Sequence, residues 1–243
     1  VTDIKIFVRS DNNSINTKDF KKYLNIQEQD NFINDQIINL NSTFTINASI
    51  DDTFNIKKFD IKSDLNFDNL NINYTSNFIK KYLTSFDNKI AIKNPQILFE
   101  YSNDIINLQL DGKYLLQNKE DNFFIKYKGS KNDFELYTLL DLNDSDLKID
   151  EIQYLKKKNI PSKLEILLNK SIKGFNLENI SFTENKNFIS VNNLSISDDF
   201  KLKSVDKIDA NFFNSKGIKN NFKIKKNSNN YQFIGNQIDG EKI

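Results

Sequence analysis

The stretch TFTINASI, residues 43–50, alternates strictly between polar and apolar side chains. The side chains of a β-strand point to opposite faces in turn, so a period of two predicts a strand with one apolar face and one solvated face. Antiparallel sheets commonly have one dry and one wet face, which favours antiparallel pairing for this segment.

The same period recurs along the chain, with turn-forming residues between the runs. About fifteen runs follow one another at roughly 8–12-residue spacing, which is typical of meandering antiparallel sheets. We expect turns at Asp111-Gly112, at residues 129–133 and at residues 214–217. We call the apolar positions of the clearest runs the apolar stripe: Phe44, Ile46, Ile50, Leu65, Phe67, Leu70, Ile72, Ile106, Leu108, Leu110, Phe134, Leu136, Leu140, Leu164, Ile166, Leu168, Phe222 and Ile224.

Two segments have helical spacing instead. Thr17 can cap a segment in which apolar residues recur at i, i+3 and i+4, which predicts a helical element at about residues 17–40. Phe78, Tyr82 and Phe86 predict a second, at about residues 77–87. No linker rich in proline or glycine divides the chain, so we expect one continuous β segment over residues 1–243 with short helices near its N-terminal end.

Composition excludes several classes of function. The 34 basic and 33 acidic residues nearly cancel, whereas a nucleic-acid groove usually shows an excess of positive charge. Cysteine and histidine are both absent, which removes disulfides, thiolate nucleophiles, imidazole bases and Cys/His zinc sites. No run of about 18 apolar residues predicts a membrane-spanning helix. The chain opens with Val1, and we expect it to be a fragment of a longer protein.

The remaining candidates for chemistry are carboxylates and lysines. A carboxylate hydrolase needs two carboxyls that face each other across a cleft, whereas the close pairs here occur in turn-like stretches. We interpret the lysine-rich runs 156–158 and 223–226 as solvated edges or turns. We therefore expect no enzyme activity, no metal site and no cofactor. The carboxylate pairs are Asp51/Asp52, Asp144/Asp146 and Asp198/Asp199.

Period two leaves three arrangements open for a sheet of this length. It can fold into a sandwich, close on itself, or curl into an open groove whose apolar floor is filled by something else. In a sandwich the apolar stripe is ordinary core, and in a groove the same side chains contact a ligand.

Three stretches carry a family resemblance: residues 22–41, a helical element before the first long sheet; residues 147–162, an aromatic strand leading into a turn at Pro161; and residues 229–240, a strand followed by Gly-x-x-hydrophobic-Asp. In this order they resemble the AsmA-like family of bacterial envelope proteins, in particular its YhdP and TamB type. The second stretch lacks the first proline and the glycine of the family's turn.

The resemblance implies an all-β fold, a long, twisted, open antiparallel sheet curled into a groove with an apolar concave face. It also implies a periplasmic position, an anchor in the inner membrane upstream of this segment, and passage of phospholipid between inner and outer membrane, with acyl chains on the apolar stripe. The alternative is a structural or adhesive all-β surface protein with a dry sandwich core and no ligand.

Overall fold

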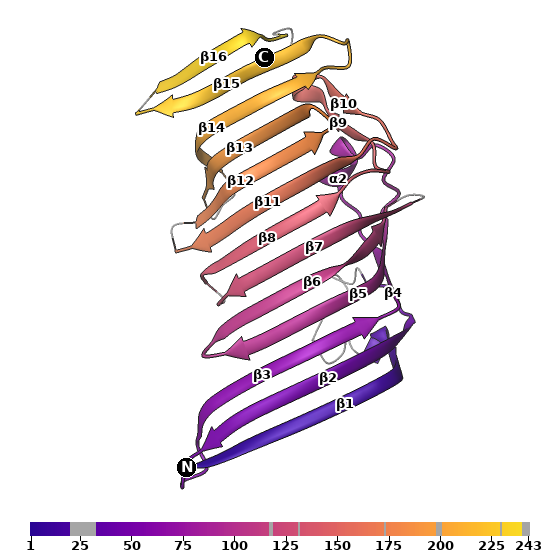
Figure 1. The fold of residues 1–243 in the computed structure, drawn as a ribbon, viewed down its shortest axis with the longest axis vertical. Helices are drawn as coiled ribbons and strands as arrows, with labels where there is room; N and C mark the ends of the chain where they lie inside the picture. Colours follow the sequence, from indigo (N-terminus) through magenta and orange to yellow (C-terminus); the bar gives the residue numbers. More distant parts are fainter. Residues whose placement is uncertain are drawn as a thin grey trace. The chain divides into compact units, whose positions relative to one another are not determined.

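Figure 1 shows the computed structural model of the chain, which describes residues 1–19, 33–116, 119–130, 132–172, 174–197, 201–228 and 230–239. Strands dominate it, accompanied by the short helical elements α2 and η2 and by helical residues 17–19. The elements are β1 (Thr2–Asn16), β2 (Ile37–Ile50), β3 (Ile56–Phe67), β4 (Asn69–Asn73), α2 (Asn77–Tyr82), β5 (Lys89–Ser102), β6 (Ile105–Leu115), β7 (Glu120–Gly129), β8 (Phe134–Asp141), β9 (Leu147–Ile149), the 3-10 helix η2 (Asp150–Ile152), β10 (Tyr154–Lys156), β11 (Ser162–Ser171), β12 (Gly174–Glu184), β13 (Asn187–Ile196), β14 (Leu202–Phe213), β15 (Lys219–Asn227) and β16 (Asn230–Gln237).

Fourteen of these strands form one antiparallel sheet in the order β1-β2-β3-β5-β6-β7-β8-β11-β12-β13-β14-β15-β16, with β4 paired to β5. The sheet is open, because β1 and β16 each have a neighbour on one side only. The fold is therefore all-β, as the alternation predicts. β9 and β10 pair separately as a small two-stranded ribbon.

The chain divides into two compact units. The first contains Val1–Thr75, Asn88–Leu116 and Asn122–Lys131. The second contains Ser76–Asp87, Gln117–Asp121 and Asn132–Ile243. The sequence predicts one continuous segment. Hydrogen bonding joins its strands into one sheet, while the contacts within the chain divide it into two compact units.

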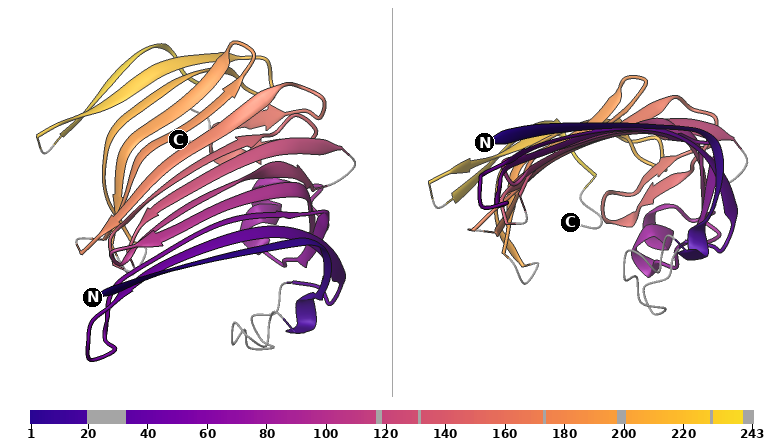
Figure 2. Two further views of the ribbon diagram at one scale, coloured as in Figure 1. Left: turned by 60° about the horizontal axis from the view of Figure 1, so that its bottom comes forward. Right: turned by 90° about the horizontal axis from the view of Figure 1, so that it is seen from below.

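Register in the first unit gathers the apolar residues on one face. Ile6 lies opposite Ile46, Ile46 opposite Ile61, Ile61 opposite Tyr101, and Tyr101 opposite Ile106. Directly opposed residues of antiparallel strands point to the same side, so this row crosses five strands on one face. Figure 2 shows that the strands of this unit also bend along their length.

The second unit repeats the arrangement. Leu164 on β11 lies opposite both Leu140 on β8 and Phe182 on β12. The row continues through Ile189 on β13 and Ala210 on β14, and ends at Phe222 on β15. Each unit therefore has one apolar face, which we define by these rows and their neighbours on alternate positions.

The expected helix at residues 17–40 is wrong at its C-terminal end. Ile37–Leu40 belong to β2, where Leu40 pairs with Asn13 on one side and Phe67 on the other. Cross-strand packing of apolar side chains here overrides helical spacing. Residues 17–19 are helical, and residues 20–32 lie outside the described part of the chain.

The second expected helix exists but is shorter than 77–87. α2 begins after Ser76, whose hydroxyl accepts a hydrogen bond from the Ile79 amide at 3.2 Å and caps the helix. It ends at Tyr82. Phe86 follows the helix and is 4% exposed, so it packs into the second unit from a loop.

The turn expected at Asp111-Gly112 is also wrong, because both residues lie inside β6. The chain reverses at Asn103 and Asp104 instead, where both residues have positive φ angles of 50° and 62°. Gly112 is needed for close approach: a Cβ built on it meets the Pro95 Cα atom at 2.9 Å and the Phe123 ring at 3.2 Å. The turns at residues 129–133 and 214–217 lie between strands as expected.

This packing yields a test of the fold. We expect Gly112→Ala to lower the free energy of unfolding by about 1–3 kcal/mol, because the added methyl group meets backbone that cannot rotate away. Gln109→Ala, on the opposite face of β6, should change it by less than about 0.5 kcal/mol. Urea unfolding followed by circular dichroism measures both, and equal effects would contradict the close approach at Gly112.

Candidate functional site

The apolar face of the first unit is only half covered. On the edge strand β1, Ile4, Ile6 and Val8 are 39%, 48% and 46% exposed. The stripe residues of the strands beyond it are half-buried, with none fully buried. A covered core normally buries such side chains almost completely. The stripe residues of this unit are thus covered on their sides by neighbouring strands, and part of each side chain stays accessible. Tyr114 and Phe123 of the same unit are buried, each 7% exposed.

The stripe falls on the apolar face of its own unit at every position, as the pairing registers show. Phe222 is buried and the other members are half-buried. Further apolar residues lie on the same faces and are not part of the stripe. Some of these residues lie close to the bulge at Asn94 and Pro95, where the alternation of polar and apolar residues breaks. The others could have been found by extending the two-residue period into neighbouring strands. The missed residues include Ile4, Ile6, Val8, Phe59, Ile61, Ile97, Phe99, Tyr101, Ile180, Phe182, Ile189, Val191, Ala210 and Phe212.

Part of the apolar face of the second unit is covered. The segment β9-η2-β10, which we call the flap, places Tyr154 against Phe182 and Phe212. The ring centroids are 5.7 and 5.5 Å apart and the rings meet edge to face, a favoured aromatic geometry. Figure 2 shows the flap inside the curve of the strands of this unit. The apolar face therefore lies on the inner side there.

A buried polar cluster anchors the flap. The Tyr154 hydroxyl donates a short hydrogen bond to the Glu184 carboxylate at the end of β12. Burial, together with this carboxylate, raises the pKa of Tyr154 above its ordinary value. A neutral phenol is thus kept as a donor in an apolar environment.

Lys156 is the most deeply buried charged residue of the cluster, with none of its surface exposed. Its ammonium donates to the carbonyl oxygens of Asn143, Ser145 and Lys157 at 3.3, 2.5 and 3.1 Å. Burial lowers the pKa of Lys156, while neighbouring carboxylates, Glu184 foremost, act in the opposite direction. A buried ammonium that satisfies three carbonyls holds the surrounding loop in one conformation.

Two interpretations of the sequence are corrected here. Lys156 does not belong to a solvated edge, and Asp144 is 7% exposed and not a solvated turn residue. Asp144 accepts a hydrogen bond from the Lys119 amide at 3.0 Å. Asp146 accepts hydrogen bonds from the hydroxyls of Thr84 and Ser85, which tie the segment after α2 to the flap. The carboxylates of Asp144 and Asp146 therefore have a structural role, because each accepts hydrogen bonds from another segment of the chain.

The pair Asp51 and Asp52 offers no facing arrangement. Asp51 and Asp52 lie in the turn after β2, and Asp51 accepts hydrogen bonds from Thr53 and Asn55. Asp198 and Asp199 lie outside the described residues. Among the described residues, no group of three or more acidic side chains could hold a metal ion.

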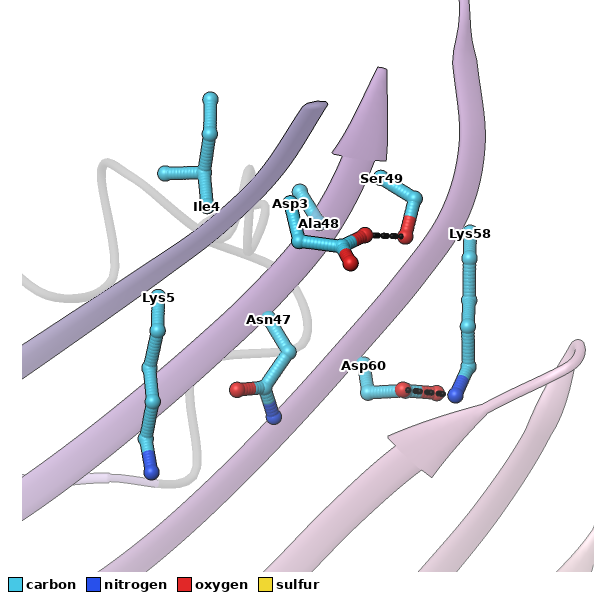
Figure 3. Close-up of a pocket in the computed structure, with 8 residues that line it drawn as sticks. All are labelled: Asp3, Ile4, Lys5, Asn47, Ala48, Ser49, Lys58 and Asp60. Atoms are coloured by element: carbon cyan, nitrogen blue, oxygen red, sulfur yellow. Dashed lines mark hydrogen bonds and ion pairs between the residues drawn. The ribbon is translucent and has the colours of Figure 1, made fainter. Parts of the chain in front are cut away.

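The polar face of the first unit carries a shallow depression of about 420 Å³ across β1, β2 and β3. Figure 3 shows two polar contacts among the side chains that line it: Asp3 accepts a hydrogen bond from the Ser49 hydroxyl at 2.6 Å, and Lys58 lies 3.1 Å from Asp60. Both contacts join neighbouring strands or positions on the polar face, so we interpret the depression as part of that solvated face.

Comparison with known protein families, with characterised proteins and with solved structures returned no match to this chain. In the described part of the chain, no helix has the length and apolar character needed to cross a membrane. The arguments for function therefore rest on the geometry of the two apolar faces.

The buried lysine gives a second test. We expect Lys156→Met to lower the free energy of unfolding by about 3–5 kcal/mol, because it leaves buried carbonyls and carboxylates without their cation. Lys157→Met, whose side chain is exposed, should cost less than about 0.5 kcal/mol. Thermal and denaturant unfolding of both variants measure the difference.

The lowered pKa of Lys156 predicts how the free energy of unfolding changes with pH. Between the lowered pKa of folded Lys156 and its ordinary value of 10.5, the unfolded chain binds more protons. Lys156 should thus make wild-type stability rise with pH in that window, and the Lys156→Met variant should lack this component. A constant gap between the two proteins across the window would contradict the burial of the charge.

Proposed function

We propose that the chain is a lipid-binding segment of an AsmA-like protein, in which phospholipid acyl chains lie on the apolar faces of the sheet. The observation that carries the proposal is the row of half-buried apolar side chains in the first unit, which no described second layer covers. Large exposed apolar patches on a protein usually mark a surface that binds something apolar.

The energetics suit transport along a surface. Each methylene group moved from water to an apolar environment gains about 0.8 kcal/mol, so an acyl chain crosses open water at high cost. A face made of many similar aliphatic and aromatic side chains offers repeated shallow contacts. A lipid bound in this way is held out of water without being trapped in one deep site.

The polar ends of the strands suit the headgroups. The turn between β2 and β3 holds Asp51 and Asn55, and Lys57 at the start of β3 lies 3.0 Å from Asp51. Headgroups would stay at such water-exposed rims while the acyl chains lie on the floor. The proposal needs no catalytic residue, metal or cofactor.

The place in the cell comes from the family resemblance. It implies the periplasm, an upstream inner-membrane anchor and passage of phospholipid between the inner and outer membranes. The principal rival, a structural or adhesive protein with a dry sandwich core, needs a second sheet over the apolar face. In the described residues the flap packs on such a face, where Tyr154 contacts Phe182 of β12 and Phe212 of β14, and no further sheet packs there.

Leu108 provides the sharpest test. It lies on β6 opposite Phe99, on the apolar face, and its neighbour Asn107 points to the other face. We expect Leu108→Asp to remain folded, with a loss of about 1–2 kcal/mol, because the carboxylate reaches water at the open face. Binding of a fluorescent fatty acid should weaken about tenfold. Asn107→Asp is the matched control and should bind like wild type.

Circular dichroism, thermal melting and probe titration separate the outcomes. Loss of about 3–5 kcal/mol or unfolding in Leu108→Asp would favour a sealed core. A folded variant with unchanged binding would reject the acyl-chain site at Leu108. Mass spectrometry of gently purified wild-type protein should find phospholipid, and its absence together with no probe uptake would reject the proposed function.

A further inference from the structure

Two neighbouring turns of the second unit carry exposed apolar side chains. Ile172, in the turn between β11 and β12, is 95% exposed, and Leu202, at the start of β14, is 63% exposed. β11 and β13 both pair antiparallel with β12, so the turns that follow them lie at the same end of this unit. We call residues 170–172, 174, 197 and 201–204 the turn end.

The two turns of the turn end are packed against each other. A Cβ atom built on Gly174 would meet the Ile196 carbonyl oxygen at 2.6 Å and the Ser197 Cα atom at 3.4 Å. The second turn is closed by its own hydrogen bonds, because the Ser197 amide donates to the Lys201 carbonyl at 2.9 Å and the Lys201 amide donates to the Ser197 hydroxyl at 3.1 Å. Backbone contacts thus fix the position of both turns within this unit.

The residue at the tip of the first turn is unusual for its place. Ser171 pairs with Gly174, which leaves a two-residue hairpin loop that begins with Ile172. Such loops usually take glycine, asparagine or aspartate. An isoleucine that is 95% exposed contributes almost nothing to the core of the chain. Its apolar surface is therefore available to something outside the chain.

The apolar face of the second unit extends to the turn end. Lys170 lies opposite Phe175, Phe175 opposite Ile196, and Ile196 opposite Leu202. Lys170 is two positions from the stripe residue Leu168 on β11, so this row lies on the apolar face. The Lys170 ammonium is 4.4 Å from the centroid of the Phe175 ring. The apolar face thus ends in a row that joins apolar side chains with an ammonium group.

Positive charge is concentrated in the sequence of these two turns. Residues 170–174 and 197–204 contain four lysines and two aspartates, which gives a formal charge of +2, whereas the whole chain carries +1. Lysines close to an anionic membrane surface each strengthen binding. Their aliphatic stems can lie along apolar surface while the ammonium groups stay in water. Exposed apolar tips flanked by lysines match the layered chemistry of an anionic bilayer surface.

The small apolar area favours a bilayer over a protein partner. Ile172 and Leu202 together offer roughly 200 Å² of apolar surface, from the usual transfer free energy per unit area. A stable protein interface buries about 800 Å² on each partner and needs a complementary shape. A bilayer needs neither, since apolar side chains enter it one at a time.

We propose that the turn end contacts an anionic lipid bilayer, with Ile172 and Leu202 inserted below the headgroups and the lysines at the level of the phosphates. This inference rests on the proposed function for the identity of the cargo and deepens it, because it names the place where acyl chains pass between a bilayer and the apolar face. The contact is weak and reversible, since even a single myristoyl chain gives only marginal membrane binding.

Tryptophan fluorescence tests insertion directly, because the chain contains no tryptophan. In Ile172→Trp, the emission should shift to shorter wavelength with vesicles of phosphatidylglycerol and phosphatidylcholine, and brominated lipids should quench it. Phe213→Trp is the matched control: Phe213 is 54% exposed and lies at the opposite end of β14 from Leu202. Its emission should stay unchanged at the same lipid concentration.

Vesicle sedimentation measures the contribution of each side chain. Ile172→Asn, which suits a turn, should lower the partition coefficient about tenfold, and adding Leu202→Thr should lower it further. Phe213→Asn should bind like wild type. The double variant Lys201→Gln and Lys203→Gln should weaken binding about tenfold on vesicles with phosphatidylglycerol and leave binding to phosphatidylcholine alone unchanged. Circular dichroism verifies that each variant is folded.

The outcomes separate this proposal from the lipid-binding function. Equal emission shifts in Ile172→Trp and Phe213→Trp, no shift in Ile172→Trp at millimolar lipid, or unchanged partitioning of Ile172→Asn would overturn the bilayer contact. Self-association of the wild type that Ile172→Asn abolishes would assign the turn end to a second copy instead. Ile172→Asn should still bind the soluble fatty-acid probe. Probe uptake without vesicle contact therefore rejects the turn end alone, whereas vesicle contact without probe uptake supports the turn end and counts against the acyl-chain face.

Discussion

Antiparallel register is the constraint on which the rest of this structure depends. Side chains along a strand alternate between the two faces of the sheet. Neighbouring strands must therefore align apolar positions with apolar positions, because a shift of one residue would move the apolar side chains of one strand to the other face. The row from Ile6 to Ile106 shows this alignment across five strands. The stripe residues of the first unit are half-buried, because neighbours within the sheet cover their sides. Tyr114 and Phe123, whose rings contact each other, are the buried aromatic residues of this unit, each 7% exposed. Ser42 and Ser63 on the same face are buried because they are short and their neighbours are long.

The two units use the same pattern with different outcomes. In the second unit the flap buries Phe182 and Phe212 beneath Tyr154, and the cluster around Lys156 holds that cover in place. The first unit has no equivalent among its described residues. One unit thus combines an apolar face with a fixed cover, and the other leaves its face accessible, which makes the first unit the better candidate for contact with lipid.

Asparagine occupies most of the backbone positions with positive φ angles in the described chain. Seven of the eleven non-glycine residues with positive φ in the described chain are asparagines, among them Asn94 and Asn103. Asparagine tolerates the left-handed region better than most residues, because its short side chain can hydrogen-bond to nearby backbone. A chain with six glycines and many tight turns uses asparagine for this purpose. The bias in composition therefore agrees with the fold, although composition alone assigns no position.

The sequence by itself determined the strands, the one-sided apolar pattern and the location of the apolar stripe, because a period of two is a local property of the chain. The pairing registers bring the stripe residues of each unit to one face, but the sequence pattern put a turn at Gly112 and a helix at Ile37–Leu40. Both errors arose where distant strands decide the local structure: Pro95 requires the glycine, and Phe67 pairs with Leu40. Only the tertiary structure decided that the sheet is open and that Lys156 is buried. Openness depends on which strands lack a neighbour, and burial depends on what packs above a residue, and neither is encoded in spacing along the chain.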